Sequence, residues 1–517
     1  MSATAPPTGP SPSSSGTGGL GRRSITATLW GTGGSAVRVV LQVASQVVLA
    51  RLLGPETFGL YAVAIVIILL SSLFADVGLA YGLIQRPHVS NDDIRFVFTW
   101  QVILGLAVSL LLLVAAPLIA RLYGDPRLTE IVAVLAPGCL INAAAATAGA
   151  LLRREMDFKT INVVGIVAYA AGFLLLAIPL ALAGAGVMSL VLAYLVQSLA
   201  TLLMQYWVVR HSLRPLLWQP EAPGLLRFGL TVLVTNLLNW AMNGIDRAIV
   251  GSALGLSAAG LYATAYNLIS APLLTGLSLL QSVFYSASAK VQDDRAQLAR
   301  GLRTLLGAVM LFAAPLFVGI AAVAETFFVT LYGTRWSGGG GVLAPLALAM
   351  PAFLVMGLST PVLWAAGFAR REFELQIPIA VAWVVVLWGV AQWGSVELLS
   401  WAVCALFYVR AAVIVRATLA AIGLAPAELL AACRAGLSVN AIVGLAALGA
   451  DRAGAATLER GIALLALDVA ACAIALLAGI WLVRDLIGED VKRLFQQLAE
   501  RIPGPAGTIA IRLLAGR

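Results

Sequence analysis

The sequence NLLNWAMNGIDRAIVGSALGLSAAGLYATAY, residues 236–266, combines a long apolar segment with a line of strongly polar side chains. At about 100° per residue, the polar residues of its first half lie within roughly a 100° arc of one helix. Hydrocarbon cannot satisfy such groups, so this stripe must face protein or water. We expect it to line an interior cavity for a polar or charged ligand, with these members: Asn236, Asn239, Asn243, Asp246 and Arg247, with Trp240 beside them.

The composition is that of a polytopic membrane protein. Of the 517 residues, 61% are hydrophobic and only 11% are charged, and the mean hydropathy is +0.95. Soluble domains carry about 25% charged residues. Apolar runs of about 18 or more residues, the signature of transmembrane helices, recur along the chain. We therefore predict an all-α polytopic membrane protein with 12–14 transmembrane helices.

Residue types that support catalysis or metal binding are scarce. The 4 cysteines form no CxxC pair, and the 2 histidines, His88 and His211, lie far apart in sequence. We predict no metal site, no cofactor and no enzymatic activity. The net charge of +9 would suggest nucleic acid in a soluble protein. Here we attribute it to membrane orientation and expect no nucleic-acid partner.

The distribution of Lys and Arg predicts the orientation. If the N-terminus is cytoplasmic and the helices alternate in direction, 25 of the 33 Lys and Arg residues fall on cytoplasmic segments and 6 on the opposite side. The cytoplasmic group includes Arg410, and the remaining two residues, Arg38 and Arg247, lie within helices. Because positive charge concentrates on the cytoplasmic side of membrane proteins, we predict a cytoplasmic N-terminus.

The chain contains an internal repeat. RLLGPETFGLYAVA at 51–64 resembles SALGLSAAGLYATA at 252–265, with an offset of 201 residues. Two further pairs keep the same order, namely ARLYGDP with VTLYGTR and ALLRREMDF with AGFARREF. Each half then holds six helices, and an even number means that both halves insert the same way. We predict two parallel six-helix lobes related by a pseudo-two-fold axis along the membrane normal.

The repeat also sets the expected domain limits. The longest connection inside the membrane region carries three prolines and suits a linker between the lobes. The N-terminal segment is low in complexity, and the C-terminal segment predicts an amphipathic helix that lies on the inner leaflet or packs on cytoplasmic loops. The expected limits are 1–22 for a disordered tail, 23–210 for the N-lobe, 211–225 for the cytoplasmic linker, 226–422 for the C-lobe, 430–484 for an additional helix pair, and 485–517 for a cytoplasmic tail with the amphipathic helix.

The same offset of 201 duplicates the polar stripe. It pairs Asn239 with Arg38, and it places Gln42 and Gln46 at the positions of Asn243 and Arg247. We therefore predict a cavity between the lobes, lined by Arg38, Gln42 and Gln46 from the first helix and by the stripe from the seventh.

Arg38 has no acidic residue within one turn. An arginine in lipid costs at least ~2.5–3.5 kcal/mol, so it needs water, a partner acid or an anionic ligand. Arginine also suits bidentate phosphate contacts, although a buried ion pair is the alternative. Asp246 and Asp76 are candidates for ion coupling. A structural hydrogen bond is the alternative for Asp76.

Several motifs resemble the polysaccharide transporter family, the Wzx-type oligosaccharide flippases of the MOP (MATE-like) superfamily. They are LARLLGPETFGLYAVA, LFADVGLAYGLIQR, LYGDPRL and LLRREMDF, with NGIDRAIVGSALGLSAAGLYATAYNL in the second half. The resemblance implies a two-lobed bundle in the bacterial cytoplasmic membrane that works by alternating access. The implied cargo is an undecaprenyl-diphosphate-linked oligosaccharide repeat unit for exopolysaccharide or lipopolysaccharide biosynthesis, with membrane lipids and polysaccharide polymerase or export proteins as partners. The resemblance places Arg38, Asp246 and Arg247 in the cavity.

Three other functions remain open from the sequence. A MATE-type drug or cation exporter shares the fold class, but it favours acidic residues in its cavity. A lipid II flippase has the same helix count and a cationic cavity. A membrane glycan polymerase or ligase, which is an enzyme, is expected to carry a large outer loop rich in Arg, Asp and His, and every predicted outer loop here is small.

Overall fold

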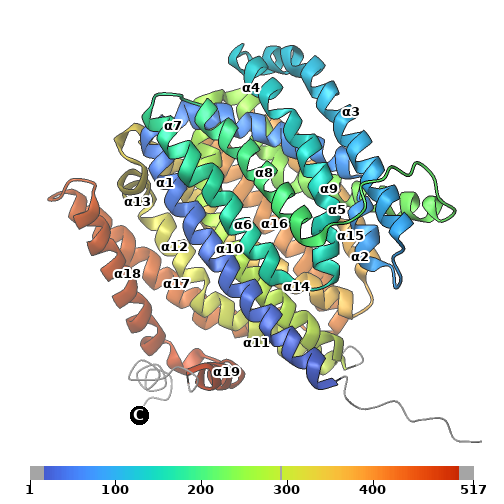
Figure 1. Cartoon of the computed structure of the whole chain (residues 1–517). Helices are drawn as coiled ribbons and strands as arrows, with labels where there is room; N and C mark the ends of the chain where they lie inside the picture. Colours follow the sequence, from blue (N-terminus) through green and yellow to red (C-terminus); the bar gives the residue numbers. More distant parts are fainter. Residues whose placement is uncertain (1–16, 291–293, 500–517) are drawn as a thin grey trace, which may run out of the picture.

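The computed structural model describes residues 17–290 and 294–499, and every regular element in these ranges is helical (Figure 1). The helices of the first half are α1 (Thr17–Asp76), α2 (Leu79–Gln85), α3 (Asn91–Tyr123), α4 (Arg127–Leu135), α5 (Pro137–Arg154), α6 (Phe158–Tyr169), which continues as a π-helix (Ala170–Ala177), α7 (Ile178–Leu182) and α8 (Met188–Val209). Those of the second half are α9 (Ala222–Leu254), α10 (Leu256–Lys290), α11 (Arg295–Phe312), α12 (Ala314–Ala322), α13 (Ala324–Tyr332), α14 (Gly339–Ala365), α15 (Ala369–Ala391) and α16 (Val396–Ile422). Three more follow: α17 (Pro426–Ala455), α18 (Ile462–Leu482) and α19 (Glu489–Ala499).

Within the described residues, 12 helices are long and apolar enough to cross a membrane. The first of them, Gly33–Asp76, has 44 residues and contains a non-helical break at Gly54. At 1.5 Å per residue it is roughly 66 Å long, about twice the hydrocarbon thickness, so it accounts for two crossings. Helix α10, with 35 residues, is long enough to add another. The predicted all-α polytopic fold is confirmed.

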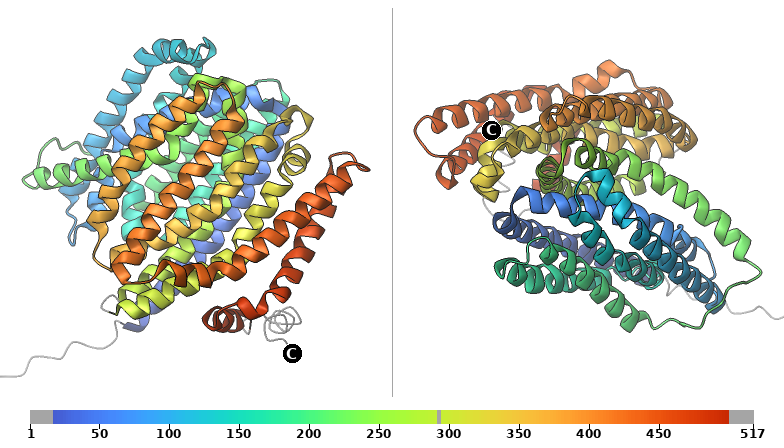
Figure 2. Two further views of the ribbon diagram at one scale, coloured as in Figure 1. Left: turned by 180° about the vertical axis from the view of Figure 1, so that it is seen from behind. Right: turned by 90° about the horizontal axis from the view of Figure 1, so that it is seen from above.

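The two halves form two groups of helices side by side. Viewed from above, the blue-to-teal helices form one layer and the yellow-to-orange helices the other (Figure 2). Gly54 and Gly255 occupy matching breaks, with φ of 78° and 86° and ψ of 172° and 175°. Positive φ is a conformation that glycine adopts without steric cost, which explains why the repeat keeps a glycine at both positions. The predicted pair of parallel lobes is confirmed.

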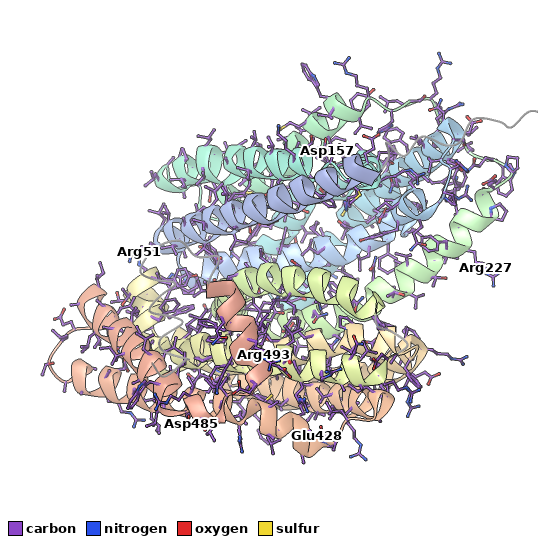
Figure 3. The ribbon with its side chains drawn as sticks, turned by 90° about the horizontal axis from the view of Figure 1, so that it is seen from below. Arg51, Asp157, Arg227, Glu428, Asp485 and Arg493 are labelled. Carbon is purple, nitrogen blue, oxygen red and sulfur yellow. The ribbon has the colours of Figure 1, made fainter. Side chains whose placement is uncertain are left out.

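Side chains near Gly54 join the two lobes at one end of the molecule. Arg51 donates hydrogen bonds to the carbonyl oxygens of Thr330 (2.6 Å) and Leu331 (2.7 Å) at the end of α13. Trp336 donates from its indole Nε1 to the carbonyl oxygen of Ala50 at 3.0 Å. Figure 3 labels Arg51 at the border between the two groups of helices. The end of α13 has free carbonyl groups, as every helix C-terminus does, and a residue of the other lobe caps it.

The RRE segment at residues 153–155, which forms the end of α5, makes structural contacts. Arg154 donates to the carbonyl oxygens of Leu83, Arg86 and Pro87 at 2.5–2.8 Å, so it caps the C-terminus of α2. The side chain of Asp157 accepts from the backbone nitrogen of Thr160 at 3.0 Å and begins α6 as its N-cap. These contacts fix the end of the N-lobe at which α2 and α5 end and α6 begins.

The additional helix pair packs on the outer side of the second lobe. Helix α17 contacts α11 and α12, and α18 packs on α17 (Figures 1 and 2). In α19, Val491 is buried and the ring of Phe495 stacks on Phe312 of α11 at 4.7 Å. This contact favours the alternative in which the amphipathic helix packs on the protein. Ile502, which the sequence also placed on its apolar face, lies outside the described residues.

The observed helix bounds can be set beside the expected domain limits. Helix α8 ends at Val209 and α9 begins at Ala222, so the stretch between them coincides with most of the predicted linker. Residues 1–16 of the expected disordered tail lie outside the described residues, and α1 begins at Thr17, inside the range expected for that tail. The domain limits themselves stay a prediction.

Candidate functional site

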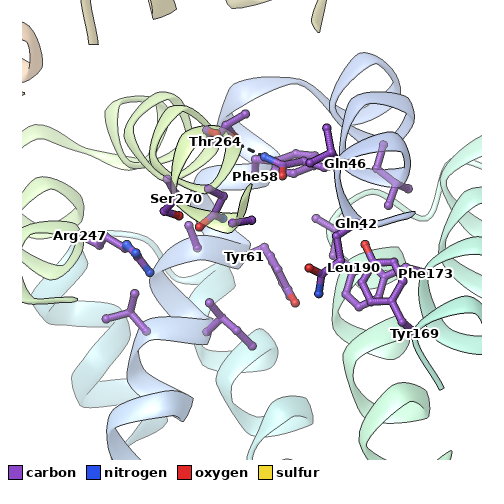
Figure 4. Close-up of a pocket in the computed structure, with 18 residues that line it drawn as sticks. Gln42, Gln46, Phe58, Tyr61, Tyr169, Phe173, Leu190, Arg247, Thr264 and Ser270 are labelled. Carbon is purple, nitrogen blue, oxygen red and sulfur yellow. Dashed lines mark hydrogen bonds between the residues drawn. The ribbon is translucent and has the colours of Figure 1, made fainter. Parts of the chain in front are cut away.

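A pocket of about 320 Å³ lies between the two lobes (Figure 4). Helices α1, α6 with its π-helical extension, and α8 form one side, and α9 and α10 form the other. Its walls include apolar and aromatic side chains, such as Phe58, Phe173 and Leu190. Its polar lining consists of Gln42, Gln46, Tyr61, Tyr169, Arg247, Thr264, Asn267 and Ser270.

The N-lobe side of the pocket is held by α1 and α6. Gln42 and Gln46 lie one helical turn apart on α1, and the side-chain amide of Gln46 donates to the carbonyl oxygen of Thr264 on α10 at 3.4 Å (Figure 4). The hydroxyl of Tyr169 is hydrogen-bonded to Ser45 at 2.5 Å, and its ring stacks on Phe173 at 4.8 Å. These contacts orient the Tyr169 ring as a wall of the pocket.

Arg247 is the charged group on the C-lobe side. Its guanidinium carbon lies 4.4 Å from the ring centroid of Tyr266, within the range of a cation–π contact. Its Nε is buried without a hydrogen-bond partner among the described residues. No carboxylate lies among the pocket-lining residues, and Arg247 is the sole charged side chain in that set. The described lining therefore has a positive charge at pH 7.

Asp246, which the sequence analysis places in the cavity, is not among the residues that line the pocket in this structure. Its side chain is 3% exposed, and its carboxylate accepts hydrogen bonds from the Tyr262 hydroxyl at 2.5 Å and from the backbone nitrogen of Arg247 at 2.9 Å. Neighbouring residues on a helix point about 100° apart, so Arg247 can face the pocket while Asp246 faces α10. Ser45, its counterpart in the repeat, likewise binds a tyrosine hydroxyl.

Arg38 lies one turn beyond Gln42, outside the pocket lining. Its guanidinium packs against α6, where a Cβ added to Gly165 would stand 3.2 Å from an Arg38 nitrogen. Its Nε is buried without a hydrogen-bond partner, and no carboxylate within the described ranges lies within 4.0 Å of it. The buried ion pair considered from the sequence is therefore not formed in this structure.

The remaining residues of the stripe lie closer to the N-terminus of α9 than Asp246 and Arg247. Asn243 donates to the carbonyl oxygen of Asn239 at 2.8 Å, and the Trp240 ring packs over Gly244. Asn239 is exposed and Asn236 is half-buried. None of these four polar and aromatic residues lines the pocket in this conformation: Asn236, Asn239, Trp240 and Asn243.

Asp76, the other candidate for ion coupling, belongs to a hydrogen-bonded chain inside the N-lobe. Its carboxylate accepts from the side-chain amide of Gln101 at 2.6 Å, and the Gln101 oxygen accepts from Thr147 at 2.5 Å. Gln101 and Thr147 are fully buried. Asp76 is not among the residues that line the pocket. The hydrogen bond matches the structural alternative, and ion coupling at this site stays a prediction.

Sequence reasoning missed Arg410. The orientation count assigned it to a cytoplasmic segment, but it lies in the middle of α16 and is 4% exposed. Its Nε donates to Gln376 at 3.1 Å, and the Gln376 amide donates to Glu372 at 2.6 Å. An arginine inside an apolar run was the signal that singled out Arg38, and Arg410 in LFYVRAAVIVR carries the same signal.

The fold is shared with two kinds of membrane transporter. The lipid II flippase MurJ in an inward closed conformation superposes with a TM-score of 0.71 and 12% identity, over 89% of this chain and 99% of that chain. An inward-facing multidrug resistance MATE family transporter of the MOP superfamily gives a TM-score of 0.60 and 16% identity, over 75% of this chain and 94% of the other. At such identities the likeness establishes the fold. The chain is a two-lobed membrane protein of this fold.

The sequence comparisons show to which family of this fold the chain belongs. The model of the family described as "Polysaccharide biosynthesis protein" matches residues 48–339, and the chain belongs to this family. It is 26% identical to the lipopolysaccharide biosynthesis protein WzxC of Escherichia coli K12, over 66% of this chain and 69% of that protein. It is 27% identical to the succinoglycan biosynthesis transport protein ExoT of Rhizobium meliloti 1021, over 68% and 72%. The resemblance stated from the motifs is confirmed.

Proposed function

We propose that the protein moves undecaprenyl-diphosphate-linked oligosaccharide repeat units across the bacterial cytoplasmic membrane by alternating access, in exopolysaccharide or lipopolysaccharide biosynthesis. Family membership and relatives named for succinoglycan transport and lipopolysaccharide biosynthesis support a role in glycan transport. The fold supports a transporter rather than an enzyme.

The charge of the pocket is the observation that carries the proposal. Arg247 is the sole charged residue among the described lining residues, and Asp246 is turned away to Tyr262. A pocket with a guanidinium and no carboxylate suits a diphosphate, which accepts charge-assisted hydrogen bonds from arginine. It does not suit the cationic drugs that a MATE-type exporter carries. The amide and hydroxyl groups of Gln42, Asn267 and Ser270 suit a sugar.

An apolar groove lies next to this polar pocket and suits the lipid part of the cargo. It has a volume of about 360 Å³ and shares Val43 with the pocket. Its other walls come from α10, α12, α13 and α14, and include Leu273, Leu277 and Phe317. A polyprenyl chain gains free energy by lying against such apolar surface.

The size of the pocket supports alternating access. A volume of about 320 Å³ is at the lower end of the range of small-molecule sites, so an oligosaccharide fits only after the lobes separate. Arg51 and Trp336 join the lobes at the end marked by Gly54. We propose that these contacts break when the protein opens at that end.

Ion coupling belongs to the same proposal. Both candidate carboxylates accept a hydrogen bond from a neighbouring side chain, Asp246 from Tyr262 and Asp76 from Gln101. If a proton or a cation bound at either carboxylate drives transport, flipping in vesicles stops when ion gradients and membrane potential are collapsed. Transport that persists at the same rate after their collapse would exclude ion coupling, but it would not contradict the proposed cargo.

Flipping of defined lipids in proteoliposomes tests the proposal. The purified protein is reconstituted with an undecaprenyl-diphosphate-linked oligosaccharide, with lipid II, or with a cationic dye, and transfer between leaflets is measured. We expect transfer of the linked oligosaccharide. Transfer of the dye alone would identify a MATE-type exporter, and transfer of lipid II alone would identify a lipid II flippase. Turnover of glycan chains without transfer would identify a polymerase or ligase.

The proposal also covers the partner proteins and the parts of the chain that move during transport. A polysaccharide polymerase or export protein would take the flipped repeat unit on the far side of the membrane. We also propose that 23–210 and 226–422 move as the two rocking units, with 211–225 as their connection and 430–484 attached to the second unit.

A further inference from the structure

The connection between α8 and α9, residues 210–221, is fixed to the N-lobe at the outer edge of the bundle (Figures 1 and 2). The backbone nitrogen of Leu216 donates to the hydroxyl of Thr99 on α3 at 2.9 Å. The side-chain amide of Gln219 donates to Asp93, also on α3, at 2.9 Å. Thr99, Asp93 and Gln219 are all buried. These bonds hold the connection along the first turns of α3.

The charges of α3 indicate how deep this connection lies in the membrane. No Asp, Glu, Lys or Arg lies between Arg95 and Arg121, and this run, 96–120, is roughly 37 Å long at about 1.5 Å per residue. It covers the ~30 Å of hydrocarbon, so the hydrocarbon begins near the start of the run. Trp100 lies one turn inside the run, and its indole Nε1 donates to the carbonyl oxygen of Leu217 at 3.1 Å. The connection therefore reaches the boundary between the headgroups and the hydrocarbon.

Polar backbone groups at this depth are bonded to side chains of α3. Arg95 donates to the carbonyl oxygens of Arg214 at 3.2 Å and of Pro215 at 3.4 Å. The nitrogen of Leu216 and the carbonyl oxygen of Leu217 have the partners given above. Pro215 has no N–H to satisfy. Water is scarce at this depth, so non-helical backbone is stable there only where the protein supplies its hydrogen bonds. The bonding of this segment meets that requirement.

Large apolar side chains of the connection are exposed. Leu213 is 49% exposed, Leu217 is 60% exposed and Trp218 is 64% exposed, and Trp207 at the end of α8 is 74% exposed. In water such surface is unfavourable, whereas contact with acyl chains is favourable by about 25 cal/mol for each Å² removed from water. Tryptophan is enriched at membrane–water interfaces, because its ring is apolar and its N–H is polar. This exposed face therefore matches lipid.

The charges of the connection match anionic headgroups. Its two arginines, Arg210 and Arg214, are exposed, and neither lies within 4.0 Å of a carboxylate in the ranges that the structure describes. Its single acidic residue, Glu221, is paired with Arg86 at 2.5 Å. The phosphates of anionic lipids attract such unpaired cations at the membrane surface.

We propose that residues 213–218 form a membrane anchor of the N-lobe, which inserts into the leaflet at the end where α3 begins. The three exposed apolar side chains of this segment contact acyl chains, and the two arginines contact lipid phosphates. The hydrogen bonds given above join the anchor to α3, so it moves with the N-lobe when the lobes rock. Insertion needs no cargo and no transport, so it is measured independently of the function proposed above.

Quenching by brominated phospholipids, in proteoliposomes of the full-length protein, tests the insertion. The difference in emission between the wild type and W218F isolates Trp218. The difference between the wild type and W383F isolates Trp383, a tryptophan that is 1% exposed. We expect brominated acyl chains to remove most of the Trp218 emission and little of the Trp383 emission, and aqueous acrylamide to remove little of either. If acrylamide quenches Trp218 and brominated lipid does not, the segment lies in water and the proposal is overturned.

Photoactivatable lipids test the charges, and they keep the proposal testable if W218F fails to fold. On the wild type, a phosphatidylglycerol analogue should label residues 213–218 more strongly than a phosphatidylcholine analogue. R210Q/R214Q should lower this preference by up to about 30-fold, which corresponds to about 2 kcal/mol for two charges, and the exposed control R335Q should keep it.

Two further results would contradict the anchor. Equal labelling of the wild type by the two lipids would exclude the contact between the arginines and anionic headgroups. If neither lipid labels residues 213–218 and L217C forms crosslinks between copies in the membrane, the surface binds a second copy of the chain instead.

Discussion

Gly59 and Gly260, equivalent residues of the two lobes, lie against each other backbone to backbone. A Cβ built on Gly59 would stand 3.2 Å from the Gly260 nitrogen, and one built on Gly260 would stand 3.0 Å from the Gly59 nitrogen. Each added carbon would also overlap a carbonyl group of the other lobe, at Leu256 and Pro55 respectively. The pseudo-two-fold axis therefore passes between these two glycines, and side chains are excluded there.

Alanine at Gly59 or Gly260 should loosen the lobe interface. Overpacking of a close contact costs about 1–3 kcal/mol, and here the overlapping atoms are backbone, which yields little. We expect G59A and G260A to lower the melting temperature of the purified protein and to reduce flipping. The control is G389A in α15, where a Cβ would meet nothing within 4 Å. Unchanged melting temperatures for both lobe variants would show that the glycines are not in contact.

We expect Asp246 to stabilise the protein through its hydrogen bond with Tyr262. Y262F removes the donor of a buried hydrogen bond and leaves the carboxylate under-satisfied, which costs about 1–3 kcal/mol. D246A should cost a similar amount, and the double variant should cost less than the sum of the two because they share one interaction. Thermal unfolding of the four proteins measures this coupling. If D246A retains full stability but loses flipping, Asp246 acts in transport instead.

Acid should destabilise the protein through His211. Its ring packs between Phe98 at 5.0 Å and Tyr206 at 5.4 Å, and burial lowers the pKa of His211 below its ordinary value of 6.5. The unfolded chain then binds more protons than the folded one, so stability is fully present above about pH 6.5 and is lost as pH falls through the folded pKa. Melting temperatures between pH 8 and pH 5 should fall less steeply in H211Q. H88Q, at an exposed histidine, should follow the wild type, and equal slopes in all three would contradict this role.

The helices and the repeat were predictable from sequence because their signals are local. The length of the apolar runs predicts the transmembrane helices. The pairs Gly54/Gly255 and Gly59/Gly260 align the two halves of the repeat. The direction of Asp246 was not predictable, because it depends on a tyrosine hydroxyl from another helix. Tyr169 and other aromatic pocket residues were missed, since an aromatic residue in an apolar helix resembles any core residue.

Arg247 provides the most direct test of the account. Flipping of an undecaprenyl-diphosphate-linked oligosaccharide is measured in proteoliposomes with the wild type, R247Q, R247K and the exposed control R335Q. Loss of a charged hydrogen-bond donor to phosphate costs about 1.5–3 kcal/mol, so R247Q should flip at least about 10-fold more slowly. R247K should recover part of the rate, and R335Q should match the wild type. An R247Q variant that folds normally and flips the cargo at the wild-type rate would contradict the central claim.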